Sequence, residues 1–142
     1  MTNILILCTG NSCRSQMAEA ILRSLNLQQV QIYSAGIETH GLNPWAMKVL
    51  EEINLPIDKL YSKNVEDLKN VNFDYVLTVC SHANETCPQF NGEAKVLHHS
   101  FDDPPAIAKS LTDENQILDI YRNVRNQIHD FLKNEFVIEL KL

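Results

Sequence analysis

The sequence predicts a single α/β domain in which a four-stranded parallel sheet is flanked by helices. Strand-like apolar runs alternate along the chain with segments whose apolar residues have helical spacing, a pattern typical of βαβ units and a parallel sheet. At 142 residues the chain is long enough for one domain with a substantial core and too short for two. No internal repeat, linker or low-complexity segment divides it. We therefore expect one layered domain.

The first half of the chain predicts two strands and two helices. Residues 4–7 form a continuous apolar run, as expected of a strand that is buried on both faces. A helix is predicted from Ser15 onward, with an inward face of Met17, Ala18, Ile21, Leu22 and Leu25. Residues 30–34 predict the second strand. Asn43 followed by Pro44 is typical of the N-cap and first position of a second helix.

The second half predicts two further strands and a long final helix. The predicted elements are a short helix around residues 65–68, strands at residues 75–79 and 95–97, and a helix over residues 113–133. The turn-rich sequence Asp102-Asp103-Pro104-Pro105 separates the last strand from this helix. We assign residues 1–134 to the domain and residues 135–142 to a C-terminal tail.

Composition and charge limit the classes of partner. The formal net charge of −6 argues against a nucleic-acid partner, which normally requires a basic face. No apolar run approaches the length that spans a bilayer, and no basic region precedes the short apolar stretch near the N-terminus. We therefore expect a cytoplasmic protein that binds neither nucleic acid nor membranes. In that compartment the four cysteines are expected to be catalytic, redox-active or metal-binding rather than joined in structural disulfides.

Chemically reactive residues follow three of the predicted strands. These are Cys8, Cys80 and the turn at residues 102–104. Parallel strands end at one edge of a sheet, and ligands of open α/β sheets bind outside that edge. The predicted topology therefore brings these three features to one site.

The loop between the first strand and the first helix, residues 8–15 (CTGNSCRS), has the composition of an oxyanion site. Such a loop directs unpaired backbone N–H groups at one point, and the helix dipole adds positive potential there. Gly10 permits a turn with positive φ, and Asn11 tolerates left-handed geometry and can fix the loop by hydrogen bonds. Arg14 offers a planar fork for two oxygens of a tetrahedral anion. The same field is expected to lower the pKa of Cys8 and make it a nucleophilic thiolate.

A structural alternative is a buried cysteine in a turn of small residues, with Arg14 solvated. For Cys8 alone that alternative would be preferred. The combination of cysteine, glycine, arginine and serine between a strand and a helix favours the oxyanion site. Cys13, at the start of the helix, is interpreted as a packed thiol.

The same loop resembles the phosphate-binding loop of low-molecular-weight protein tyrosine phosphatases. Residues 8–19 resemble more closely the thioredoxin-coupled arsenate reductases that are built on that fold. The resemblance continues through YSAGIE at residues 33–38, His40-Gly41, Asn43-Pro44, Thr78-Val79-Cys80, Cys87-Pro88 and Phe101-Asp102-Asp103-Pro104. It covers nearly the whole chain apart from residues 54–72, residues 106–112 and the tail, and the pair Cys80 and Cys87 makes it specific to the reductases. It implies a low-molecular-weight tyrosine phosphatase-like fold.

The resemblance also implies a relay of three cysteines. Cys8 attacks arsenate, for which phosphate is an analogue, while the loop amides and Arg14 hold it and Asp103 assists proton transfer to the departing oxygen. Cys80 then attacks the sulfur of Cys8, which releases arsenite and leaves a disulfide between them. Cys87 converts this bond to a Cys80–Cys87 disulfide, which thioredoxin reduces. The implied oxyanion-binding residues are Thr9, Gly10, Asn11, Ser12, Cys13, Arg14 and Ser15, and the Ser15 hydroxyl would hydrogen-bond the Cys8 thiolate. We assign no cofactor and no metal ligand.

The spacing between Cys80 and Cys87 carries a physical constraint. The six intervening residues correspond to about two helical turns, so in an intact helix the two sulfurs would lie too far apart to bond. Forming a disulfide therefore requires this segment to unwind, which its polar composition favours. The alternatives are two unrelated thiols, or half of a zinc site with His98 and His99. The spacing is not that of a zinc knuckle, and the sequence has no second cysteine pair to complete one.

A tyrosine phosphatase is the alternative enzyme. Such phosphatases carry aromatic residues after the Asp-Pro pair to flank a phosphotyrosine ring, whereas this chain has Pro105-Ala106-Ile107. A non-enzymatic oxyanion or redox sensor would need no ordered relay, and Asp103 and the two relay cysteines argue against it. Since arsenate and phosphate share shape and charge, we expect weak phosphatase activity to remain.

One position departs from the pattern of the reductases. Several of them bind a potassium ion behind the phosphate loop through an asparagine, a glutamate, a serine and an aspartate. Asn11, Glu19 and Ser34 match the first three, and Lys63 stands in place of the aspartate. Its ammonium could occupy the cation position and pair with Glu19, or Lys63 could be a solvated loop residue. Both interpretations stay open at the level of sequence.

Overall fold

The computed structural model describes residues 1–81, 83 and 94–140. In this part of the chain, one sheet comprises β1 (Thr2–Cys8), β2 (Val30–Gly36), β3 (Tyr75–Thr78) and β4 (Lys95–His98), in the order β2-β1-β3-β4. Each pair of neighbouring strands is parallel. All four strands therefore end at the same edge, which confirms the expected α/β fold with a four-stranded parallel sheet.

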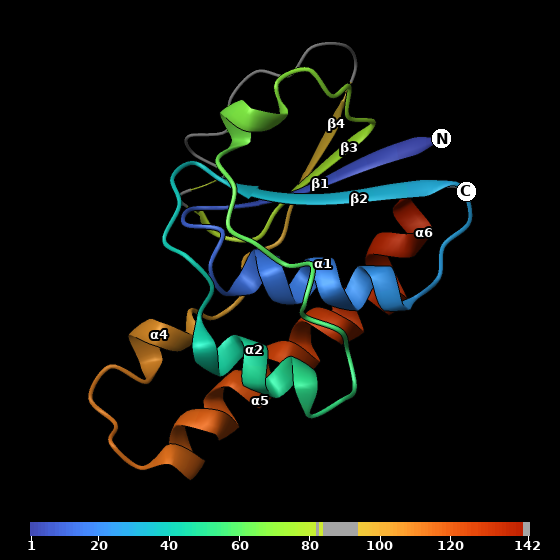
Figure 1. The fold of residues 1–142 in the computed structure, drawn as a ribbon. Coiled ribbons are helices and arrows are strands. Elements are labelled where there is room, and N and C mark those ends of the chain that lie inside the picture. Colours follow the sequence, from blue (N-terminus) through green and yellow to red (C-terminus); the bar gives the residue numbers. More distant parts are fainter. Residues whose placement is uncertain (82, 84–93, 141–142) are drawn as a thin grey trace.

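The longer helices lie together on one side of the sheet (Figure 1). They are α1 (Arg14–Ser24), α2 (Pro44–Glu51) and α5 (Glu114–Phe131), and α1 lies nearest the strands. The segment that follows α2 passes to the other side and carries the short 3-10 helix Val65–Leu68. None of the helices in the described ranges is long and apolar enough to cross a membrane.

The core forms where β1 meets α1. Ile4, Leu5, Ile6 and Leu7 are all fully buried, which confirms that this central strand is covered on both faces. The inward face of α1 supplies Met17, Ala18, Ile21 and Leu22, and α5 supplies Ile117, Leu118, Tyr121, Val124 and Ile128. Burial of this apolar surface fixes the position of the loop that joins β1 to α1.

The start of α2 is capped as the sequence predicts. The Asn43 side-chain Oδ1 accepts hydrogen bonds from the backbone N–H groups of Trp45, at 2.9 Å, and Ala46, at 3.1 Å. Pro44 occupies the first helical position, where no N–H group is needed. This cap holds residues 38–43 against the loop at the end of β1.

The last helix extends beyond the boundary that we drew at residue 134. After α5 the chain continues as a π-helical turn, Leu132–Phe136, and then as α6 (Val137–Glu139). Phe136 and Leu140 are buried in the same core as the strands, and the Tyr75 hydroxyl donates to the Leu140 carbonyl at 2.9 Å. Residues 135–140 therefore pack as part of the domain, while the end of the expected tail, residues 141–142, lies outside the described residues.

Candidate active site

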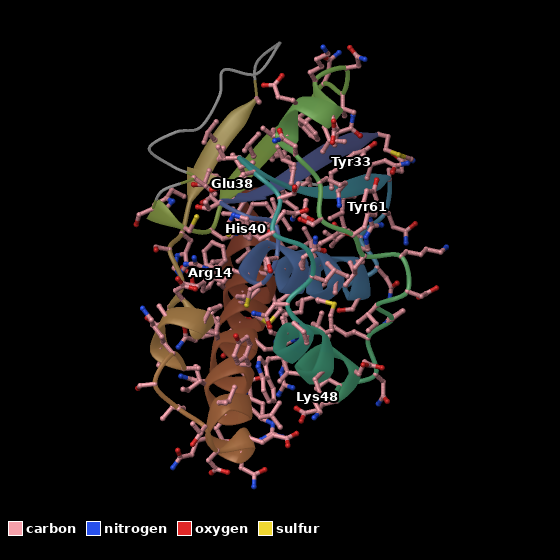
Figure 2. All side chains as sticks on the ribbon, turned by 60° about the vertical axis from the view of Figure 1, so that its left-hand side comes forward. Arg14, Tyr33, Glu38, His40, Lys48 and Tyr61 are labelled. Atoms are coloured by element: carbon pink, nitrogen blue, oxygen red, sulfur yellow. The ribbon has the colours of Figure 1, made fainter. Side chains whose placement is uncertain are left out.

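A pocket of about 790 Å³ lies at the edge where the strands end. It is lined by Cys8, Thr9, Gly10, Ser12, Cys13, Arg14, Glu38, His40, Asn43, Cys80, Ser81, Ser100, Asp103 and Pro105. The three features expected to converge, Cys8, Cys80 and Asp103, thus share one pocket. Figure 2 shows the side chains of Arg14, Glu38 and His40 close together at this site.

Close packing, rather than a left-handed turn, explains the glycine of the loop. Asn11 has a φ of 47° and is the left-handed residue that we expected. Gly10 does not use the positive φ that glycine permits, and among the described glycines Gly41 has one. A Cβ on Gly10 would lie 2.3 Å from Nδ1 of His40. The loop therefore needs glycine there because the imidazole packs against its backbone.

The segment after β2 holds the loop from one side. Backbone N–H groups of Glu38, His40 and Asn43 donate to the carbonyl oxygens of Thr9, Gly10 and Ser12 at 2.9–3.0 Å. These bonds engage loop carbonyls that would otherwise repel an anion. With these carbonyls engaged, the backbone N–H groups of the loop are the groups that can donate to an anion in the pocket.

The start of α1 is open to an anion. Cys13 occupies the N-cap position without a side-chain hydrogen bond, and the first turn holds no acidic residue. The backbone N–H groups of the first turn have no partner within the helix, and the helix dipole makes this end positive. The loop and the helix start together form a cradle for a tetrahedral oxyanion.

Arg14 is fixed at the wall of the pocket. Its side chain is only 14% exposed, and Nη1 donates to the Phe101 carbonyl at 2.9 Å. Its Nη2 lies 3.8 Å from Oδ1 of Asp103, whose side chain is 48% exposed. Asp103 stands directly before the short helix α4 (Pro104–Ile107). The guanidinium is thereby oriented, and the carboxyl group of Asp103 lies beside it.

Cys8 and Cys80 both line the pocket, and each shifts the pKa of the other. The Cys80 sulfur also lies 3.3 Å from the Thr9 hydroxyl and 3.4 Å from the backbone N of Ala83, which donates to it. The bond from Cys8, aided by those from Thr9 and Ala83, lowers the pKa of Cys80 to about 5. The bond to Cys80 and burial raise the pKa of Cys8.

The expected lowering of the Cys8 pKa is therefore wrong for this arrangement. Arg14 and the backbone N–H of Thr9 do favour the Cys8 thiolate, as the loop composition predicts. The sequence did not show that a second sulfur with two further donors would lie against it. The two thiols titrate together, because a charge on one disfavours a charge on the other, and the surrounding donors favour the thiolate of Cys80.

Cys13 behaves as the packed thiol that we expected. It is 7% exposed, and burial raises the pKa of its thiol to about 12. It therefore stays protonated at neutral pH and contributes no nucleophile.

A buried polar cluster lies behind the loop. Asn11 Nδ2 donates to the hydroxyl oxygens of Ser15, at 2.9 Å, and Ser34, at 3.0 Å. Ser34 in turn donates to Glu19 Oε1 at 2.6 Å, and the backbone N–H of Lys63 donates to Asn11 Oδ1 at 2.8 Å. The expected bond from Ser15 to Cys8 is not formed within the described structure, where Ser15 is engaged with Asn11 instead.

Lys63 belongs to this cluster, so its interpretation as a solvated loop residue is wrong. It is 7% exposed, and its Nζ lies 3.8 Å from Glu19 Oε1. The ammonium also donates to the Tyr61 carbonyl at 2.8 Å and lies 4.1 Å from the centre of the Tyr61 ring. Burial lowers the pKa of Lys63, and the nearby Glu19 carboxylate opposes that shift.

The two histidines at the end of β4, His98 and His99, do not line the pocket. His98 Nδ1 lies 2.8 Å from the Thr78 hydroxyl, and His99 stacks on Phe131 at 4.0 Å. No group of three cysteine, histidine or acidic residues that could hold a metal ion is found among residues 1–81, 83 and 94–140. Cys87 lies outside the described residues.

Six residues that line the pocket were not predicted as site residues: Glu38, His40, Asn43, Ser81, Ser100 and Pro105. Glu38 and His40 form a pair 3.3 Å apart and line the pocket beside the loop. Both follow β2 closely, so applying the strand-end rule to the second strand as well as to the first and third would have found them.

Comparison with known proteins agrees with this architecture. The family model described as low molecular weight phosphotyrosine protein phosphatase matches residues 3–136. An arsenate reductase of Oceanobacillus iheyensis is 40% identical over 131 residues, which cover 92% of this chain and 91% of that protein.

Solved structures share the fold at lower identity. The YwlE arginine phosphatase from Geobacillus stearothermophilus has a TM-score of 0.75 at 22% identity, with 99% of this chain and 94% of that chain covered. A thioredoxin-dependent arsenate reductase from Corynebacterium glutamicum has a TM-score of 0.65 at 23% identity, with 100% of this chain and 64% of that chain covered. From the extent of the family match and the identity to the Oceanobacillus protein, this chain belongs to the low molecular weight phosphotyrosine protein phosphatase family.

Proposed function

We propose that the protein is an arsenate reductase that uses Cys8, Cys80 and Cys87 in turn and is regenerated by thioredoxin. The observation that carries this proposal is that Cys8 and Cys80 line the same pocket and shift each other's pKa. A phosphatase needs one nucleophilic cysteine there, whereas a reductase needs a second thiol placed to accept the first in a disulfide. The similarity to the Oceanobacillus arsenate reductase supports the same conclusion.

Arsenate binds as a tetrahedral anion between the loop amides of residues 9–15 and Arg14. The uncapped start of α1 supplies N–H donors and a positive dipole end. The planar guanidinium binds two oxygens, and it is already oriented by the Phe101 carbonyl. In this binding mode the central arsenic atom would lie above Cys8.

The first chemical step requires the charge of the cysteine pair to move to Cys8. The proton of Cys8 passes to Cys80 along the bond between their sulfurs, and the Thr9 amide and Arg14 stabilise the resulting Cys8 thiolate. Neutral Cys80 then does not repel the arsenate. Cys8 forms a sulfur–arsenic bond, and an oxygen leaves as water with a proton from Asp103.

In the second step Cys80 loses to solvent the proton that it took from Cys8, and the charge returns to Cys80. Its thiolate is favoured by the Thr9 hydroxyl and the Ala83 amide. It attacks the Cys8 sulfur, so that a disulfide forms, the sulfur–arsenic bond breaks, and its electron pair reduces pentavalent arsenic to arsenite. Because both cysteines line the same pocket, the attack occurs within it.

The remaining steps regenerate the enzyme. Cys87 attacks Cys80, and thioredoxin reduces the Cys80–Cys87 disulfide that results. The related Corynebacterium protein is described as thioredoxin-dependent, which supports this choice of reductant. The cysteines of the described chain, Cys8, Cys13 and Cys80, are free, in keeping with a reducing compartment. We therefore assign the protein to the cytoplasm.

A coupled assay tests this function directly. Arsenate should drive oxidation of thioredoxin by the unmodified protein, and Cys8→Ser should abolish it while thermal unfolding stays nearly unchanged. The hydroxyl of serine is similar in size but far less nucleophilic than a thiolate at neutral pH. Substantial arsenate turnover by the Cys8→Ser variant would contradict the mechanism.

Phosphatase activity is the second candidate function. The family fold and the loop support hydrolysis of small phosphate esters through Cys8, Arg14 and Asp103. The wall after Asp103 has Pro105 rather than an aromatic ring, so we expect weak activity on aryl phosphates. A kcat/KM for an aryl phosphate that exceeds the value for arsenate would favour the phosphatase instead.

A further inference from the structure

We propose that the side chain of Asn43 is a further binding group of the oxyanion pocket, and that Tyr121 orients it for this role. The amide Nδ2 of Asn43 donates one hydrogen bond to the Tyr121 hydroxyl and a second to an outer oxygen of the bound anion. The contact serves any tetrahedral oxyanion, and its consequence for arsenate rests on the proposed function.

Asn43 lies where the oxyanion loop meets the start of α2. It lines the same pocket as Arg14 and Asp103, and its backbone N–H donates to the Ser12 carbonyl at 3.0 Å. The first turn of α2, like that of α1, holds no acidic residue. The positive ends of both helix dipoles are therefore directed at the pocket, with Asn43 at one of them.

The hydrogen bonds of Asn43 fix the direction in which its amide points. Oδ1 accepts from the backbone N–H groups of Trp45, at 2.9 Å, and Ala46, at 3.1 Å. Because both of these partners are donors, the amide oxygen faces the helix and Nδ2 faces away from it. Nδ2 donates to the Tyr121 hydroxyl at 3.0 Å. The amide is thus held from both sides.

One hydrogen of this amide is left for a ligand. Nδ2 carries two hydrogens, and the Tyr121 hydroxyl accepts one of them. The other has no acceptor in the part of the chain that the structure describes. Since Asn43 lines the pocket, an oxyanion held by the loop can supply that acceptor. A donor that is already fixed in place binds the anion without the cost of being oriented.

Tyr121 is a positioning residue that acts through Asn43. It lies on α5, which packs beside α2 (Figure 1), and it is only 2% exposed. Burial raises the pKa of the Tyr121 hydroxyl, so the group stays neutral and brings no negative charge toward the anion. With phenylalanine at this position, the helix cap alone would hold the amide.

Calorimetric titration of the reduced protein with inorganic phosphate tests the binding group without turnover. Asn43→Ser keeps a residue that caps helices but removes the amide, so phosphate should bind about tenfold more weakly. Asn43→Asp keeps both the cap and the shape but places an oxygen where Nδ2 stands, so the loss should be larger. Tyr121→Phe should weaken phosphate binding by about threefold, because the amide is less firmly held.

Tyr75→Phe is the matched control for Tyr121→Phe. It also removes one hydroxyl hydrogen bond, the one to the Leu140 carbonyl at 2.9 Å, but Tyr75 does not line this pocket. Its phosphate affinity should equal that of the unmodified protein, while thermal unfolding measures the cost of the lost bond. A double variant, Asn43→Ser with Tyr121→Phe, should bind phosphate no more weakly than Asn43→Ser alone.

Arsenate kinetics distinguish a substrate contact from a structural role. For Asn43→Ser the KM for arsenate should rise about tenfold with little change in kcat, as when a contact is made equally in the ground state and the transition state. Unchanged phosphate affinity in folded Asn43→Asp, or an equal loss in Tyr75→Phe and Tyr121→Phe, would overturn the proposal. If the phosphate affinities change as expected but the unmodified protein does not turn over arsenate, the binding group is supported and the reductase function is contradicted.

Discussion

Thr9 contacts both reactive cysteines. Its hydroxyl lies 3.3 Å from the Cys80 sulfur, and its backbone N–H donates to the Cys8 sulfur. One residue of the loop therefore stabilises a negative charge on either member of the pair. The Thr9 side chain favours the thiolate of Cys80, and the Thr9 backbone N–H favours the thiolate of Cys8.

Thr9→Val should impair the disulfide step more than oxyanion binding. Valine keeps the shape and the backbone N–H but removes the hydroxyl at Cys80. One hydrogen bond of about 1 kcal/mol corresponds to a rise of roughly one unit in the Cys80 pKa. We expect slower arsenite release in single-turnover experiments, with little change in aryl phosphate hydrolysis. Thr9→Ser, which restores the hydroxyl, should recover arsenite release, and equal loss of both activities in Thr9→Val would contradict this role.

The cysteine pair should titrate as a unit. Cys80 has a folded pKa of about 5, below its ordinary value of 9.0, so one thiolate is present above that pH and is protonated below it. Thiolate absorbance should therefore rise by one equivalent near pH 5 and stay level through neutral pH, because Cys8 keeps its proton. The step near pH 5 should disappear in Cys80→Ser. A first thiolate that forms only above pH 8 in the unmodified protein would contradict the shared charge.

Asp103→Asn should slow formation of the arsenic adduct without preventing anion binding. The amide keeps the shape but cannot donate an acid proton, a loss of about 10²–10⁴-fold. Asp102→Asn is the matched control, because Asp102 is exposed and does not line the pocket. Pre-steady-state release of arsenite measures both variants. A larger effect from Asp102→Asn would show that the acid is assigned to the wrong residue.

Lys63 should make the protein indifferent to potassium. Its buried ammonium lies 3.8 Å from Glu19 Oε1, so a second cation beside the same carboxylate would be repelled. We expect equal melting temperatures in potassium and sodium salts at matched ionic strength. Lys63→Asp should introduce a stabilisation specific to potassium, because an ion that binds the folded state alone raises its stability. A clear potassium-specific rise for the unmodified protein would rule this out.

The structural features that depend on residues close together in the sequence were predicted best. The apolar run before Cys8, the Asn43 cap and the shared edge of the strands follow from local spacing and the rules of parallel sheets. Gly10 was predicted to matter for a different reason, since only the folded structure brings His40 against it. The pKa shifts of Cys8 and Cys80 depend on a contact between residues 72 positions apart in numbering, which loop composition cannot reveal.

The end of the chain shows the same limit. Residues after 134 lack a strong helical pattern, so the sequence gives no reason to place them in the domain. Phe136 and Leu140 are nevertheless buried, because the helix continues through a π-helical turn that changes the face it presents. The sequence likewise allowed Lys63 either to occupy the cation position or to be a solvated loop residue. Its burial in the folded structure decides for the first interpretation.

Mapping of disulfides after a single turnover tests the proposed relay most directly. Reduced protein is mixed with one equivalent of arsenate without thioredoxin, quenched with an alkylating agent and digested for mass spectrometry. The unmodified protein should release one arsenite and contain a Cys80–Cys87 disulfide. Cys87→Ser should release one arsenite and stop at a Cys8–Cys80 disulfide, whereas Cys80→Ser should release none. A Cys8–Cys87 disulfide in the unmodified protein, or a full equivalent of arsenite from Cys80→Ser, would contradict the order in which the three cysteines act.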